Sequence, residues 1–111
     1  RRTNQNEYLT EALNFKSFSL NIITNILKSQ NKSIKLTATE STILKLLFLN
    51  PGQIISKRKI IQAIWQNGDF TDENILNVNM SRLRDKLSQI GLADKIVTEY
   101  GKGYRLLNDE K

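Results

Sequence analysis

Side chains that can read the edges of DNA bases gather between residues 74 and 86 of this chain. Arg82 can donate two parallel hydrogen bonds to guanine, and Asn74 can pair with adenine or with a phosphate. Val78 can contact a thymine methyl group, and Ser81 can donate or accept a hydrogen bond. At about 100° per residue, these four side chains share one face of a helix. The pattern therefore predicts a helix whose outer face suits the major groove of double-stranded DNA.

The opposite face of this predicted helix, which spans about 73–90, is apolar. Its narrow core-facing stripe consists of Leu76, Met80, Leu83, Leu87 and Ile90. Asn79, Arg84 and Lys86 flank the outer face, where the two cations are placed to reach phosphates. Because a charged helix face is usually only solvated, this helix indicates DNA binding only together with the elements around it.

Further cations stand where a second helix and a hairpin are predicted. Lys57, Arg58 and Lys59 open the second helix, and its free backbone amides together with these cations can bind a phosphate. The alternative is an ordinary charged first turn, although positive charge there opposes the helix dipole. Lys102 lies between two glycines at the tip of the hairpin, where it can reach the adjacent minor groove or serve only as a charged turn residue.

The composition speaks against enzymatic chemistry. The chain has no cysteine and no histidine, which excludes disulfides, thiol catalysis and thiolate zinc sites and removes the commonest general base. Glu40, Asp72 and Glu73 are placed to begin helices, and Asp85 lies among cations, so no paired-acid site is evident. We expect no catalytic residue, no metal and no cofactor.

The charge indicates an anionic partner. The net charge is +6, which favours a nucleic acid, an acidic protein or an anionic membrane surface, although a merely basic protein would look the same. No apolar run approaches the roughly 20 residues of a membrane-spanning helix, so we expect a cytoplasmic protein without a membrane partner.

Periodicity places these residues on an α+β fold. Apolar alternation over 14–36 predicts a small antiparallel sheet, and Thr37 with Glu40 has the spacing of a capping box for a helix that ends at 50–52. Ser56 caps a second helix to about Gln66, with Ile60, Ile61, Ile64 and Trp65 as its apolar face. Residues 96–107 predict a β-hairpin with its turn at 101–103. The order predicts a winged helix-turn-helix with an N-terminal four-stranded antiparallel sheet, three helices and a C-terminal hairpin wing. Residues 1–13 are expected to be an interdomain linker and 14–111 the domain.

Six motifs in the expected order resemble the OmpR/PhoB family, the C-terminal effector domains of two-component response regulators. They are LTATE at 36–40, NPG at 50–52, ISK at 55–57, IW at 64–65, VNMSRLRDKL at 78–87 and GKGYRL at 101–106. The resemblance covers about 14–107. Within the family, FTDEN at 70–74 and VNMSR at 78–82 look more like the branch that answers cell-envelope antibiotics and antimicrobial peptides.

The resemblance implies a transcription regulator that binds promoter DNA as a head-to-tail pair on direct repeats. It implies an N-terminal receiver, phosphorylated on aspartate by a sensor kinase, before the present residues. By position, Val78 and Arg82 match base-reading residues. Positions near the phosphates or groove are matched by Trp65, Asn74, Arg84 and Thr98. A loop that contacts RNA polymerase in some members is matched by Asn67, Gly68, Asp69, Phe70 and Thr71.

The wing departs from the family pattern. Many members carry an arginine that enters the minor groove where this chain has Tyr100, preceded by Glu99. Two alternatives stay open: Lys102 takes over the contact, or the minor-groove contact is weak. A winged helix can also bind protein or RNA, but such a surface should be apolar, whereas Val78 is the one apolar residue on the predicted outer face.

Overall fold

The structure, a computed structural model, describes residues 12–108. Most of the expected linker, 1–11, lies outside the described residues. Its last two residues, Ala12 and Leu13, belong instead to the first strand, and Leu13 packs against the core. The strand takes them in because Leu13 pairs with Leu20 on the core-facing side of the sheet. The domain therefore begins no later than Ala12.

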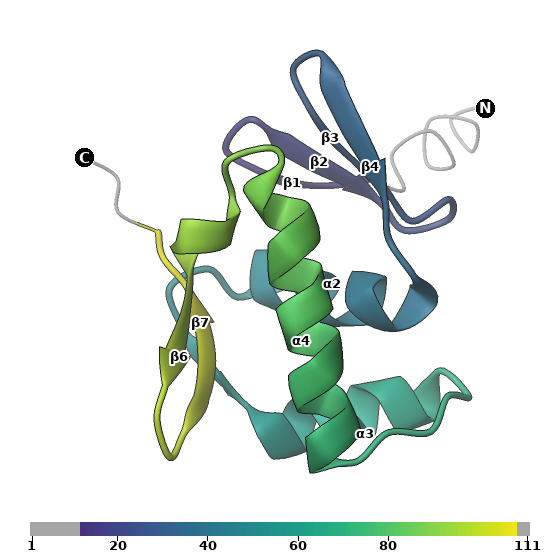
Figure 1. The fold of residues 1–111 in the computed structure, drawn as a ribbon, viewed down its shortest axis with the longest axis vertical. Helices are drawn as coiled ribbons and strands as arrows, with labels where there is room; N and C mark the ends of the chain where they lie inside the picture. The colour runs from purple at the N-terminus through teal and green to yellow at the C-terminus, as the bar shows by residue number, and fades with distance from the viewer. Residues whose placement is uncertain (1–11, 109–111) are drawn as a thin grey trace, which may run out of the picture.

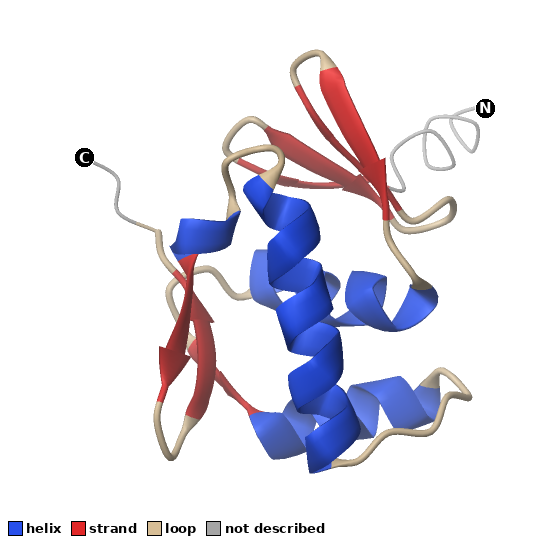
Figure 2. Ribbon diagram, viewed as in Figure 1, coloured by secondary structure: helices blue, strands red, loops and turns tan. Residues whose placement is uncertain are grey.

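A four-stranded sheet is followed by three helices and a second small sheet (Figures 1 and 2). The elements are β1 (Ala12–Phe15), β2 (Phe18–Asn21), β3 (Ile26–Ser29), β4 (Lys32–Lys35), α2 (Ala38–Leu49), β5 (Ile54–Ser56), α3 (Lys57–Gln66), α4 (Glu73–Ser88), the 3₁₀ turn η1 (Ala93–Lys95), β6 (Ile96–Glu99) and β7 (Gly103–Leu106). The predicted winged helix-turn-helix architecture is confirmed.

The first sheet is an antiparallel meander in the order β1-β2-β3-β4. Leu20 pairs with Leu27, and Leu27 pairs with Ile34, so one apolar row crosses the sheet and faces the helices. Asn25 and Gln30 adopt left-handed backbone angles in the predicted turns, with φ of 62° and 57°. The sheet lies at the end of α4 that is far from α3 (Figure 1).

Side-chain caps fix where the helices begin. Thr37 Oγ1 accepts from the Glu40 amide at 3.1 Å, and Glu40 Oε1 accepts from the Thr37 amide at 2.9 Å, which completes the predicted capping box. Ser56 caps α3 through the Lys59 amide, and Asp72 caps α4 through the Ile75 amide.

The third helix ends at Ser88, two residues before the predicted Ile90. Gly91 has a φ of +79°, and the Leu92 amide donates back to the Leu87 carbonyl oxygen, so the chain reverses in a tight turn that takes up Ile90. The core stripe of α4 is otherwise as predicted. Leu76, Met80, Leu83 and Leu87 are buried, and Ile90 is half-buried.

The wing, defined as β6, β7 and the turn between them, is the predicted hairpin, but the sheet that contains it has a third strand. β5 pairs with β7 and gives a three-stranded sheet in the order β5-β7-β6. A Cβ atom on Gly103 would lie 2.0 Å from the Ile55 carbonyl oxygen, and its φ is +151°, so only glycine lets β5 approach. β7 is thereby attached, from Arg105 to Gly103 beside the turn, to the segment that leads into α3.

Candidate nucleic-acid interface

The outer face of α4, defined as Asn74, Val78, Ser81 and Arg82, is exposed to solvent. The Val78 side chain is 49% exposed. Within residues 12–108, Arg82 makes no hydrogen bond and no ion pair, so its guanidinium is available to a ligand. The predicted separation of the two faces is confirmed, since the residues on the opposite side of the helix are buried.

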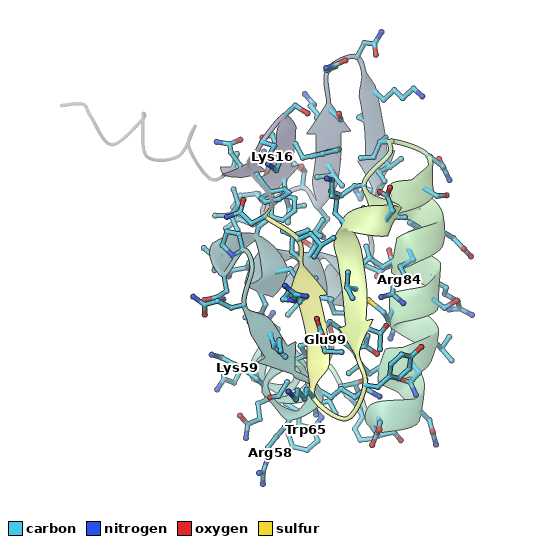
Figure 3. The ribbon with its side chains drawn as sticks, turned by 90° about the vertical axis from the view of Figure 1, so that its left-hand side faces the viewer. Lys16, Arg58, Lys59, Trp65, Arg84 and Glu99 are labelled. Atoms are coloured by element: carbon cyan, nitrogen blue, oxygen red, sulfur yellow. The ribbon has the colours of Figure 1, made fainter. Side chains whose placement is uncertain are left out.

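The flanking residue Arg84 is tied to the wing instead of extending into solvent. Its Nη2 donates to the Ile96 carbonyl oxygen at 3.1 Å and to Thr98 Oγ1 at 2.9 Å. Its Cζ atom lies 5.8 Å from the centre of the Tyr104 ring, a cation–π distance. Figure 3 shows Arg84 pointing from α4 toward β6. The sequence predicts a phosphate contact for Arg84 and does not reveal these bonds, because it does not show that β6 lies beside this face of α4.

The second flanking cation, Lys86, forms an ion pair with Glu40 of α2. The Lys86 Nζ and Glu40 Oε1 atoms are 2.6 Å apart, and the Glu40 side chain is 2% exposed. Glu40 therefore has two tasks, capping α2 and holding α4 against it. Sequence reasoning found the first task and missed the second, since no spacing rule links residues 46 positions apart. Asn79, the third flanking residue, is half-buried.

The start of α3 faces the turn of the wing. A cleft of about 370 Å³ lies between them, lined by Ser56, Lys57, Arg58, Glu73, Gly101, Lys102 and Gly103. Three predicted phosphate-binding positions thus border one hollow; Arg58 and Lys102 are exposed and Lys57 is half-buried. Lys57 is engaged by Glu73 at 3.3 Å and by Asn77 at 3.4 Å, an exposed arrangement that is worth little energy. Arg58 projects from the α3 end of the molecule (Figure 3).

The turn of the wing exposes a tyrosine. The Tyr100 side chain is 90% exposed, and Lys102 is exposed beside it. Glu99, the acidic residue before the turn, pairs with Arg105 across the wing at 2.7 Å, so its charge is neutralised within the sheet. Thr98 is half-buried, and its hydroxyl accepts from Arg84. Both alternatives for the minor-groove contact therefore stay open.

The loop 67–71 is exposed at four of its five positions. Phe70 is 72% exposed, and Asn67 Nδ2 donates to Thr42 Oγ1 of α2 at 2.9 Å. Thr71 is wholly buried, so its side chain differs from the predicted surface position.

Trp65 is 53% exposed, which corrects its predicted place on the apolar face of α3. Its Nε1 donates to the Thr71 carbonyl oxygen at 2.9 Å, and this bond draws the indole over the loop.

Sequence families and solved structures match this arrangement. The family described as "Transcriptional regulatory protein, C terminal" matches residues 31–106. The response regulator protein GraR of Staphylococcus aureus (strain MRSA252) is 45% identical over 74 residues, which is 67% of this chain and 33% of GraR. The chain thus spans about a third of the length of the curated relative. None of the helices in residues 12–108 is long and apolar enough to cross a bilayer.

Two solved structures share the fold over nearly their whole length. The C-terminal domain of the nisin resistance regulator NsrR, titled a lantibiotic response regulator, is 42% identical with a TM-score of 0.81, covering 88% of this chain and 99% of that domain. The DNA-binding domain of CpxR from E. coli is 25% identical with a TM-score of 0.72, covering 87% of this chain and 96% of that domain. This chain therefore belongs to the family of C-terminal domains of transcriptional regulatory proteins, the OmpR/PhoB type.

Proposed function

We propose that this domain binds double-stranded promoter DNA sequence-specifically, with α4 in the major groove and the wing at the adjacent minor groove. One observation carries the proposal. The outer face of α4 exposes an arginine, an asparagine, a serine and a valine, while the opposite stripe of the same helix is buried. These side-chain types cover the donor, acceptor and methyl contacts that distinguish base pairs in the major groove.

Exposed charges on three elements support the same orientation. Arg82, Arg58 and Lys102 are exposed cations on three separate elements, α4, α3 and the wing turn. A duplex laid along α4 would meet all three, and each phosphate neutralised would release counterions. We assign base contacts to Asn74, Val78, Ser81 and Arg82. We assign phosphate or groove contacts to Lys57, Arg58, Trp65, Asn79, Thr98, Tyr100 and Lys102.

Arg84 and Lys86 enter the proposal differently. Their guanidinium and ammonium groups already have partners in Thr98 and Glu40. A phosphate contact from either residue must use its remaining N–H donors or replace an internal bond. Their contribution to affinity should therefore be smaller than that of Arg58 or Lys102.

The likeness to response regulators supports a longer regulator around this domain. We propose that the full protein carries an N-terminal receiver controlled by a sensor kinase, and that two copies bind direct repeats head to tail. The loop 67–71, with Phe70 exposed, is the proposed contact with RNA polymerase. The likeness to NsrR, whose title names a lantibiotic response regulator and nisin resistance, supports the branch that answers antimicrobial peptides. The proposal includes no catalytic step and no cofactor.

Binding to labelled duplexes tests the proposal. Fluorescence anisotropy should first be measured on a duplex selected from a random pool and on a scrambled duplex, each at two salt concentrations. We expect tighter binding to the selected duplex, and a log–log salt slope of about −0.9 per phosphate contacted. Lys28→Ala is the control for a change of charge alone, because Lys28 lies in β3, at the end of the molecule far from α3. It removes one charge away from the proposed face and should leave the preference for the selected duplex unchanged. Equal affinity for both duplexes, or no dependence on salt, would contradict the proposal.

A further inference from the structure

We propose that Arg84 is a positioning residue that fixes the wing against α4 and so sets the distance between the recognition face and the wing turn. The first observation is where its two hydrogen bonds go. Both end on β6, at the Ile96 carbonyl oxygen and the Thr98 hydroxyl. β6 is the edge strand of its sheet and pairs only with β7 within the described residues. Arg84 thus donates hydrogen bonds to a strand that has a neighbouring strand on one side.

A second contact attaches the other strand of the wing to the same helix. The Tyr104 ring of β7 is 4% exposed, and its hydroxyl donates to Asn77 Oδ1 at 3.4 Å. The guanidinium of Arg84 packs over this ring. Asn77 and Arg84 are seven residues apart, which is about two helical turns, so they lie on the same side of α4. The wing therefore contacts α4 at two positions along the helix axis, Asn77 and Arg84.

The position of the wing turn depends on these contacts. β5 holds β7 from Arg105 to Gly103, beside the turn, whereas β6 within the described residues has only β7 and the α4 contacts to hold it. Tyr100 and Lys102 in the turn are exposed. A shift of β6 relative to β7 would therefore move Tyr100, which follows β6 directly, and change the shape of the turn that carries Lys102. Binding groups generally need to be held to within about 0.5 Å of their productive geometry. Arg84, whose charge suggests a phosphate contact, would then affect DNA affinity mainly by holding the wing in place.

Distance measurements on the free protein test the first half of this inference. The chain has no cysteine, so Tyr100→Cys with Ser88→Cys gives one specific pair of spin labels, on the wing turn and at the end of α4. We expect Arg84→Gln to broaden the distance distribution and shift its maximum. Arg82→Gln is the matched control, because it makes the same change two residues away on the outer face and should leave the distribution unchanged.

A milder variant keeps the test decisive if Arg84→Gln does not fold. Thr98→Val removes one acceptor but keeps Arg84 and its bond to Ile96, so it should broaden the distribution less. The positioning role is wrong if Arg84→Gln folds and gives the same distribution as Arg82→Gln. If Arg84→Gln does not fold, Thr98→Val takes its place in this comparison. None of these measurements involves DNA, so they do not depend on the proposed function.

Binding tests the second half, which rests on the proposed function. The affinity loss from Lys102→Ala should be clearly smaller in the Arg84→Gln background, since a misplaced wing has little contact left to lose. Equal losses in both backgrounds, or no loss from Lys102→Ala in the original protein, would overturn this part. Failure of the original protein to bind any duplex would instead overturn the proposed function and leave the distance result standing.

Discussion

The outer face and the flank of α4 carry similar residues but have different surroundings. Arg82 is exposed and has no partner among residues 12–108, whereas Arg84, two positions later, bonds to the wing, and Lys86 pairs with the buried Glu40. All three are basic residues on a helix with an apolar stripe. Their difference teaches that charge and spacing locate a surface helix, while neighbouring elements decide which cations remain free. The predictions below test this division of α4 into a free face and an internally bonded flank.

The largest expected effect lies on the buried stripe that defines both regions. Leu83→Ala should lower the free energy of unfolding by about 2–5 kcal/mol, because it leaves a cavity between α4 and the core. Denaturant unfolding followed by circular dichroism measures this. Ser81→Ala, on the exposed side, should change the same quantity by less than about 0.5 kcal/mol. Similar losses from both variants would mean that the faces of α4 are misassigned.

The flank should come next. Lys86→Met should lower the free energy of unfolding by about 2 kcal/mol, since the Glu40 carboxylate would lose its cation while remaining buried. The loss is smaller than for a fully buried pair because the Lys86 side chain is 32% exposed. Adding Glu40→Gln should recover part of the loss, as glutamine can still cap α2 without a charge. A Lys86→Met variant as stable as Arg82→Met would remove the distinction between flank and outer face.

The outer face should show its effect in binding and not in stability. Arg82→Ala should weaken binding to the selected duplex by about 1–3 kcal/mol and relax the preference at one base pair, because a bidentate contact to guanine is lost. Anisotropy titrations on duplexes changed one base pair at a time measure both quantities. Unchanged affinity together with unchanged base preference would show that Arg82 reads no base.

Val78 should give the smallest effect. Val78→Ala should weaken binding by about 1 kcal/mol or less, roughly the value of one or two buried methyl or methylene groups. The informative comparison replaces single thymines of the duplex with uracil, which lacks the methyl group. At one position, the original protein should lose affinity on this replacement, while the Val78→Ala variant should not. If both proteins respond alike at every position, Val78 contacts no thymine methyl group.

Local signals in the sequence predicted most of the fold. The capping box at Thr37 and Glu40, the end of α2 at Asn50 and the buried stripe of α4 are all confirmed. Two element boundaries lie two residues from where the sequence suggested them: β1 begins at Ala12, and α4 ends at Ser88. Termini depend on pairing partners and turn geometry, which periodicity does not report. The base and phosphate contacts stay predictions, because they depend on a partner outside the chain.

The sequence by itself determined which side of each helix is apolar, where the caps lie and which side chains the outer face of α4 offers, because these follow from neighbours within a few positions. Only the tertiary structure decided that β5 joins the wing, that Trp65 lies over the loop 67–71, and that Arg84 and Lys86 have internal partners. Those contacts join residues that folding brings together from different elements. The freedom of a charged side chain depends on such contacts, and it is therefore a property of the folded domain.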